Sequence, residues 1–243
     1  MTQTLRLCFD VRDDLLEGAR ACEREVFDSA YGNTPEQLAA EYGPYDEASV
    51  FIALATDEGR VMGACRVILP SERGLKTLVD LQREPWRLDG QRSARAAGID
   101  PQTTWDIATL GVRTELGRSG VMAAAALYHG LVMGGRTNGV TTMITILDQR
   151  VRKLLHMVGL MTHVLPGAWP AEYLGSPRST PVYAHLAAVV DGQRRLTPDA
   201  YRLITQGQGL VGVHSPGPEG FVLKPHERVL TVPARIEERI PLG

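Results

Sequence analysis

The residues with the clearest chemical potential lie where a predicted strand ends and the chain turns through two glycines into a helix of small residues. The strand, 105–112, carries Asp106, and Gly117 and Gly120 stand in the turn that follows it. The first amides of a helix lack partners within the helix and lie at the positive end of its dipole. Glycines also let a ligand approach the backbone closely. This junction therefore predicts a site for a phosphate-bearing ligand.

Three carboxylates are candidates for proton transfer. Asp106 lies in an otherwise apolar strand, where an acid needs polar partners. Glu41 and Asp46 belong to a turn-rich segment of acidic and aromatic residues. A carboxylate near a reacting amine can take its proton directly or through a water. The structural alternatives are a solvated acidic loop for Glu41 and Asp46, and a salt bridge for Asp106.

Two arginines are the natural partners of these acids. Arg66 stands among apolar residues of the predicted strand 61–69, and Arg24 stands in the predicted first helix. A guanidinium can orient carboxylates or bind the carboxylate of a ligand with two parallel hydrogen bonds. A purely structural ion network is the alternative for both residues.

Apolar periodicity predicts the elements that position these side chains. A first helix is expected over 13–30, and Thr34-Pro35 begins a short second helix. Residues 57–59 connect two strands as a hairpin, and residues 70–97 are expected to be polar and irregular apart from the short apolar segment 75–81. The remaining expected elements are strands at 50–55, 61–69, 105–112, 140–147, 164–165 and 182–190, with helices at 120–136 and 148–158.

Composition narrows the class of protein. The chain has 243 residues, 44% of them apolar, and a formal net charge of −2, which is typical of a globular protein and argues against a general nucleic-acid binder. Cys8, Cys22 and Cys65 are far apart, as in proteins of reducing compartments. No signal-peptide core or membrane-spanning run is present, and the histidines show no metal-ligand spacing. We therefore predict a cytoplasmic protein without a metal site or membrane span.

The order of elements predicts an α/β or α+β fold with a mixed sheet. Residues 1–190 are expected to form one domain. From about residue 191 the composition of the chain changes, and residues 206–219 are rich in Gly, Pro and Ser. We expect 191–243 to be a C-terminal extension that packs on the domain or is exchanged with a second copy, as a lid, an arm or an added strand.

Five segments, in order, resemble motifs of one enzyme group. They are Arg24-Glu-Val-Phe27 (similar to Arg-x-x-Val-Phe), Glu41 with Tyr45-Asp46, Gly63–Pro70 (similar to Gly-x-x-Arg-Leu-Leu-Pro), Trp105–Val112 (similar to Trp-Glu-(Ile/Leu)-Ser-Arg-Phe-x-Val) and Asp148–Gly159. Over roughly residues 12–190 the chain thus resembles the acyl-homoserine lactone synthases and N-acyl amino acid synthases of the GNAT superfamily.

The resemblance implies a GNAT-like, mostly antiparallel central sheet flanked by helices. It also implies N-acyl transfer from an acyl thioester to the amine of an amino acid or similar small acceptor, with no tightly bound cofactor. The donor thioester would be carried by acyl carrier protein or by coenzyme A. The glycine turn departs from the usual pyrophosphate motif, because Gly117 occupies the place of its Arg or Gln, and this favours the carrier protein.

The resemblance also implies roles along the strand and turn. The backbone of Leu110, Gly111 and Val112 would hold the thioester and its oxyanion, and the turn would hold the pantetheine phosphate, with candidates at Arg113, Gly117, Arg118 and Gly120. Arg24, Arg66 and Thr109 would shape the acceptor side, next to Glu41, Asp46 and Asp106 as candidate catalytic groups. No Ser or Cys nucleophile motif is present, so the amine is expected to attack directly.

Three alternatives stay open. An acyl-homoserine lactone synthase would consume S-adenosylmethionine, but those enzymes carry Arg where this chain has Thr109. A catalytically silent GNAT-fold binding module and an ordinary acetyl-CoA-dependent acetyltransferase are the others. Arg150, Arg152 and Lys153 on the helix 148–158 are candidates for contact with an acidic carrier protein, or a solvated helix face.

Overall fold

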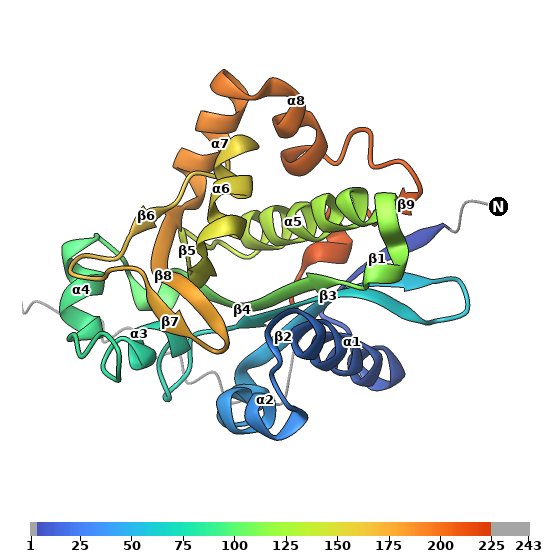
Figure 1. Ribbon diagram of the computed structural model, residues 1–243. Helices are drawn as coiled ribbons and strands as arrows, with labels where there is room; N and C mark the ends of the chain where they lie inside the picture. The colour runs from blue at the N-terminus through green and yellow to red at the C-terminus, as the bar shows by residue number, and fades with distance from the viewer. Residues whose placement is uncertain (1–3, 225–243) are drawn as a thin grey trace, which may run out of the picture.

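The computed structural model describes residues 4–224, which fold around a nine-stranded mixed sheet (Figure 1). The strand order is β6-β8-β5-β4-β3-β2-β1-β9, and β7 pairs with β8. The strands are β1 (Leu5–Phe9), β2 (Ser49–Thr56), β3 (Val61–Ile68), β4 (Thr104–Val112), β5 (Thr142–Asp148), β6 (His163–Val164), β7 (Ala171–Tyr173), β8 (Ser176–His185) and β9 (Val213–His214). Most neighbouring pairs are antiparallel, as expected for the predicted fold class.

Helices cover both faces of the sheet (Figure 1). Helices α1 and α2 lie on one face, and α5 lies on the other with α6 and α7. The helices are α1 (Asp13–Tyr31), α2 (Pro35–Tyr42), α3 (Lys76–Asp80), α4 (Gly90–Ala96), α5 (Gly120–Thr137), α6 (Gln149–Met157), α7 (Leu186–Leu196) and α8 (Pro198–Ala200). The largest core cluster fills the space between α5 and strands β1 to β4.

Local signals explain how α1 and α2 meet. Helix α1 ends at Gly32, whose φ of 68° is a left-handed conformation that glycine adopts without strain. Thr34 then begins α2 with a capping box, because its side chain accepts from the Gln37 amide while the Gln37 side chain accepts from the Thr34 amide. This tight junction fixes α2 beside the central strands.

Strands β4 and β5 run in parallel and separate soon after they meet. Their pairing covers only Thr104–Asp106 against Thr142–Ile144. Beyond that point β4 remains paired with β3 as far as Val112, and β5 remains paired with β8 as far as Asp148. The two halves of the sheet therefore diverge and leave an open edge on each strand.

The structure corrects three expectations. Residues 70–97 contain α3 and α4, because Leu75, Leu78 and Leu81 recur every three residues and pack with Trp86 in a second core cluster. The strand β1 was not predicted, although its apolar residues alternate along Leu5–Phe9. The expected strand 182–190 is a strand only to His185, after which the chain enters α7.

The described part of the C-terminal extension packs against the rest of the molecule. Strand β9 pairs in parallel with β1 at the edge of the sheet, so the tail adds a strand there. Phe221 is buried, and its ring lies 5.9 Å from that of Phe9. The predicted boundary at residue 190 falls inside α7, and residues 225–243 lie outside the described residues. Within 4–224, no helix combines the length and apolar character needed to cross a bilayer.

Candidate active site

A cavity of about 300 Å³ occupies the gap between the diverging strands. The wall formed by α5, α7 and the segment around α6 is mainly apolar, with Leu131, Val132, Leu155, Leu160, Leu186 and Val189. The opposite wall, formed by α1, α2, the open end of the sheet and the hairpin of β7 and β8, carries Tyr31, Tyr42, Thr109, Asp148, Tyr173 and Ser176. We refer to the first wall as the apolar end of the cavity and to the second, where polar groups lie beside Phe27 and Leu174, as its polar end.

The open edge of β4 presents backbone amides to this cavity. The Arg113 amide donates to the Met62 carbonyl on β3. Gly111, two residues before Arg113, lies opposite Ala64 of the same strand β3. Successive residues of an antiparallel strand turn their amides to opposite sides. The Gly111 amide therefore faces β3, whereas the amides of Leu110 and Val112 face the gap that β5 leaves open. Those two amides are the ones able to hold an oxyanion.

A buried ion network lies beside this edge. Arg66, 5% exposed, donates from Nε and Nη2 to the two carboxylate oxygens of Glu23 at 3.0 and 2.7 Å. Its Nη1 donates to Asp46 at 2.6 Å, and Arg20 also contacts Asp46. The Thr109 hydroxyl donates to Glu23 at 2.5 Å. Thr109 lines the cavity, so it is the point at which this network meets the cavity wall.

A second network surrounds Lys76. Its ammonium donates to Asp80 at 2.6 Å, to the Tyr173 hydroxyl at 2.8 Å and to Glu41 at 2.9 Å. Burial lowers the pKa of Lys76, but its carboxylate partners outweigh that effect and hold the pKa above its usual value. The Tyr42 ring lies between the two networks, 5.1 Å from the Arg66 guanidinium carbon and 5.2 Å from the Lys76 nitrogen. Tyr42 and Tyr173 also line the cavity.

Asp106 lies deeper in the protein, where β4 and β5 still pair. Its carboxylate accepts from the Thr77 amide at 2.5 Å and from the Thr77 hydroxyl at 2.8 Å. Burial raises its pKa to about 7, against the opposing effect of the two hydrogen bonds. Asp106 is not among the residues that line the cavity, so the structure places this predicted acid behind the wall.

The glycine turn is a short 3-10 helix, Thr114–Ser119, and the two arginines next to it differ in their surroundings. Gly117 has φ 49° and ψ −122° between β4 and α5, and Gly120 is the first residue of α5. Arg113 donates to the Val61 carbonyl and pairs with Glu25, so its charge is already neutralised. Arg118 is exposed and lies in the last turn before α5. Only Arg118 is therefore free to meet a phosphate at this junction among the described residues.

The prediction that Arg24 pairs with the acids is wrong. The Arg24 side chain is exposed on α1 and makes no hydrogen bond or ion pair with any described residue, whereas the neighbouring Glu23 is buried against Arg66. The quoted motif places its arginine three residues before the Val-Phe pair. Since Val26 begins that pair here, the matching position is 23 and holds an acid. Counting three residues back from Val26, as the motif requires, would have identified Glu23 instead of Arg24.

The Lys76 network was not predicted. Lys76 and Asp80 are four residues apart in a segment expected to be irregular, and this spacing on a helix is the signal that they share a face. Tyr173 comes from β7, nearly a hundred residues later, and only the fold brings it to Asp80. Glu41 was a predicted candidate, and the structure places it on this network rather than in the cavity.

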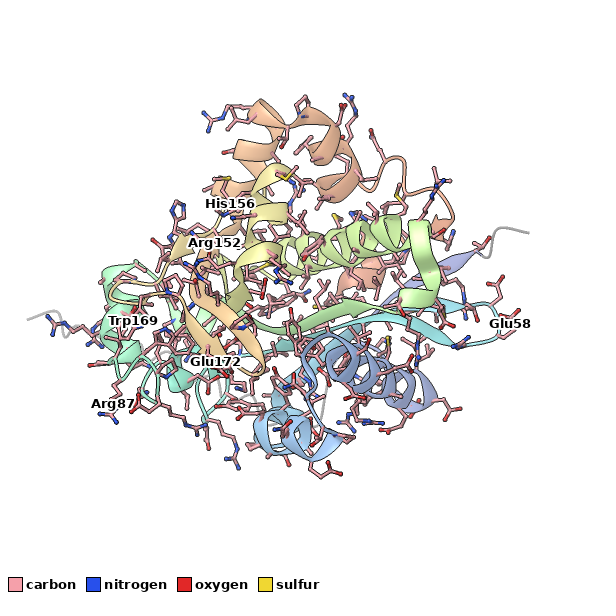
Figure 2. The ribbon with its side chains drawn as sticks, viewed as in Figure 1. Glu58, Arg87, Arg152, His156, Trp169 and Glu172 are labelled. Carbon is pink, nitrogen blue, oxygen red and sulfur yellow. The ribbon has the colours of Figure 1, made fainter. Side chains whose placement is uncertain are left out.

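The basic residues of α6 also divide into two kinds. Arg150 and Lys153 are exposed. Arg152 is partly buried and donates to the hydroxyl and carbonyl of Thr162, next to His156, which contacts the same hydroxyl (Figure 2). Arg152 therefore belongs to the local structure, which leaves a smaller basic surface than the three residues predicted.

Solved structures share this fold. FeeM, an N-acyl amino acid synthase from uncultured soil microbes, aligns with a TM-score of 0.60 and 12% identity over 79% of this chain and 95% of its own. BjaI, a CoA-dependent acyl-homoserine lactone synthase, aligns with a TM-score of 0.57 and 16% identity over 90% and 97% of the two chains. The chain has the GNAT fold. The predicted fold class and resemblance are confirmed at this level.

The similarity extends to acetyltransferases. A putative N-acetyltransferase from Lactobacillus plantarum aligns with a TM-score of 0.51 and 12% identity over 75% of this chain and 99% of its own. At the level of sequence, no protein-family model and no curated protein matches the chain. At these identities the structures establish a shared GNAT architecture, and the chemistry has to be argued from the cavity.

Proposed function

We propose that this chain is an N-acyltransferase that moves an acyl chain from a thioester to the amine of a small acceptor, an amino acid or a similar molecule. The observation that carries the proposal is the cavity between β4 and β5. It joins an apolar end to a polar end. The Leu110 amide faces it from β4, and the Val112 amide faces the same gap two residues farther along, beyond the lining residues. This arrangement provides separate places for an acyl chain, a carbonyl oxygen and an amine.

The reaction is a direct transfer. The lone pair of the neutral amine attacks the thioester carbon, a C–N bond forms, and the C–S bond breaks. The sulfur leaves with the proton that the nitrogen gives up, so the products are an amide and a free thiol. An amide donor aimed at the oxyanion lowers the barrier by about 3 kcal/mol in well-studied enzymes. Leu110 and Val112 would supply such donors.

Thr109 is the group best placed to take part in proton movement. Thr109 lines the cavity and its hydroxyl donates to Glu23, so it can accept a proton from the nitrogen while passing its own to that carboxylate. The reverse transfer then delivers the proton to the leaving sulfur. Asp46 and Glu41 are held by Arg66 and Lys76 outside the cavity. We therefore assign Glu41 and Asp46 a positioning role, which revises the role expected from their sequence.

The donor thioester would enter from the glycine turn. Arg118 and the amides at the start of α5 suit the phosphate of a pantetheine arm, whether coenzyme A or acyl carrier protein bears it. Arg150 and Lys153 are exposed and suit an acidic carrier protein. We propose the carrier protein as the donor because the turn lacks the usual basic residue before its glycines.

Mass spectrometry of lipid extracts would test the proposal. Cells that express the chain are compared with cells that express Thr109→Val, which removes one hydroxyl at nearly constant volume. Thr145→Val is the matched control, because Thr145 lines the cavity without a hydrogen bond to an acid of the described chain. We expect new N-acyl amines with the wild type and the control, and at least a tenfold loss with Thr109→Val.

Other products would redirect the proposal. An acyl-homoserine lactone as the new species would replace it with the lactone synthase alternative, which Thr109 disfavours. Equal amounts of N-acyl amine from Thr109→Val and wild type would remove Thr109 from the proton path. No acylated product from extracts supplied with thioester donors and mixed amines would contradict acyl transfer itself.

A further inference from the structure

The polar end of the cavity has a distinctive charge. Among the described residues that line the cavity, Asp148 is the only one with a formally charged side chain. Lysine, arginine and histidine are all missing from that lining. A ligand that fills this end therefore meets one negative charge and a set of neutral hydroxyls.

The carboxylate of Asp148 is ionised and fixed in place. One oxygen accepts from the Arg150 amide at 2.7 Å at the start of α6, and the other accepts from the Ser176 hydroxyl at 2.7 Å. Partial burial raises the pKa of Asp148. The hydrogen bonds from Ser176 and from the amides of Arg150 and Val151, together with the charge of Arg150, outweigh that effect and hold the pKa below its usual value. An ionised carboxylate has about four acceptor positions, so capacity remains for a ligand.

Aromatic side chains lie next to this carboxylate. Burial raises the pKa of Tyr31, the negative charge of Asp148 adds to this effect and the positive charge of Arg150 opposes it, so both charged groups lie near Tyr31. The rings of Tyr31 and Phe27 are 5.6 Å apart, and both residues line the cavity. Aromatic faces combined with a carboxylate favour organic ammonium groups, through cation–π attraction and a charged hydrogen bond.

The lining of this end offers no cation to a ligand carboxylate. The charge of Arg150 acts on Asp148 and on Tyr31, but Arg150 is exposed on α6 and does not line the cavity. Arg66 and Lys76 are the buried cations of the described chain, and neither lines the cavity. Arg66 is held by Glu23 and Asp46, and the three N–H groups of Lys76 are used by Asp80, Glu41 and Tyr173. A carboxylate placed beside Asp148 would be repelled by it and would have no cation of the cavity lining as a partner.

We propose that the acceptor is a small organic cation, a primary amine without a carboxylate group, whose ammonium is bound by Asp148 beside Tyr31 and Phe27. This inference rests on the proposed function and narrows its acceptor from amino acids to amines. The bound ammonium loses a proton to solvent before the neutral nitrogen attacks the thioester. Asp148 is thus the residue that selects the acceptor.

Matched pairs of acceptors test this inference on the wild-type chain. Tyramine is compared with tyrosine, phenethylamine with phenylalanine and tryptamine with tryptophan, each with the same acyl thioester. We expect kcat/KM for each amine to exceed that for its amino acid by about tenfold or more, since an unpaired buried charge costs at least that much. Preference for the amino acids would overturn the inference and leave the proposed acyl transfer intact.

Asp148→Asn isolates the charge. Asparagine caps helices as well as aspartate does. Its Oδ1 can accept from the Arg150 amide while its Nδ2 donates to the Ser176 hydroxyl, so we expect the fold to survive. Asp89→Asn is the matched control, because Asp89 begins α4 by accepting from the Arg92 amide and does not line the cavity.

We expect Asp148→Asn to raise KM for the amines about tenfold and to reduce the preference over amino acids, with little change in Tm, while Asp89→Asn changes neither kinetic quantity. An unchanged KM and selectivity in Asp148→Asn would overturn the inference. Absence of acyl transfer by the wild type to every acceptor would instead overturn the proposed function, and this inference with it.

Discussion

Glu23 connects three elements through one carboxylate. It lies on α1, receives two hydrogen bonds from Arg66 on β3 and one from Thr109 on β4, and is 4% exposed. Removing one partner of a buried ion pair leaves the other charge without compensation, which is more costly than the pair itself is stabilising. The neighbouring Arg24 has no such partner among the described residues.

We therefore predict that Glu23→Ala lowers the free energy of unfolding by about 3–5 kcal/mol, whereas Arg24→Ala changes it by less than about 0.5 kcal/mol. Urea unfolding at pH 7 measures both. The two residues are adjacent in the sequence, so the comparison isolates the buried pairing. Similar small losses in both variants would show that the Glu23–Arg66 pair is not formed as described.

Asp106 makes stability depend on pH. Its pKa is raised from 3.8 to about 7 in the folded chain, mainly by burial. Between these values the folded state holds a proton that the unfolded state has lost, so the free energy of unfolding falls as pH rises. Above the folded pKa the two states hold equal numbers of protons at this residue, and its contribution becomes constant.

The expected result is that Asp106→Asn gains stability relative to wild type as pH rises from 4 to 7, and that the difference then levels off. Unfolding curves at four pH values, with the variant and the wild type side by side, measure this difference. A difference that stays constant from pH 4 to 8 would contradict the raised pKa of Asp106.

At the scale of elements, the approach of α1 to β4 depends on a glycine. A Cβ built on Gly111 would lie 2.4 Å from a methyl carbon of Val26, which is too close for any real contact. Because α1 carries Glu23 as well as Val26, this approach brings the ion network to the open edge of β4.

Gly111→Ala is expected to destabilise the chain by about 1–3 kcal/mol, and adding Val26→Ala is expected to restore part of that loss. Gly192→Ala is the control, because its Cβ meets nothing within 4 Å in the helix α7 and alanine favours helices. Thermal or urea unfolding is measured for the wild type, Gly111→Ala, Val26→Ala and the double variant, which form a double-mutant cycle, and for Gly192→Ala. Independent, additive effects of the two substitutions would contradict the close packing of α1 on β4.

Much of this element arrangement could be predicted from periodicity, but the assembly of the site could not. The helices 13–30 and 120–136 and the strands near Arg66 and Asp106 were placed within a few residues, because each has a clear apolar pattern. The helix around Lys76 was missed because it is one turn long, and Tyr173 because its partner Asp80 is distant in the sequence. Contacts between distant segments depend on tertiary packing, which local patterns do not contain.

The same limit affected individual site residues. Asp106 was correctly placed in the central strand, but its enclosure by Thr77 follows from the packing of α3. The sequence predicted that the backbone of three successive residues, Leu110, Gly111 and Val112, would hold the oxyanion. The register of β3 with β4 turns the Gly111 amide toward β3, so only the amides of Leu110 and Val112 are open. The motif at Arg24–Phe27 identified the helix that contributes to the site, but it indicated Arg24, which lies on the exposed face, instead of Glu23, which lies on the buried face.

At the scale of the whole molecule, the divergence of the two half-sheets creates the cavity, and its apolar end is enclosed by helices from both halves of the chain. Val189, on α7, lines this end and is 7% exposed. A larger side chain there would occupy space that the proposed acyl chain needs.

We predict that Val189→Phe shifts the preferred acyl thioester toward shorter chains, with kcat/KM for long chains falling by about tenfold or more because overpacking a filled cavity costs about 1–3 kcal/mol. Leu196→Phe serves as control, since Leu196 lies on the same helix and is 76% exposed. A series of acyl thioesters of increasing length measures the shift. An unchanged length profile would place the acyl chain elsewhere.

The central claim is acyl transfer from a thioester to an amine in the cavity between β4 and β5. The most direct measurement is a mass balance in which the full chain is mixed with an acyl-CoA or acyl carrier protein thioester and an excess of tyramine, and free thiol, amide and fatty acid are quantified together. We predict equal amounts of thiol and amide, both dependent on the amine, for at least one of the two donors. Thiol release that is independent of the amine and accompanied by fatty acid without amide would contradict the account.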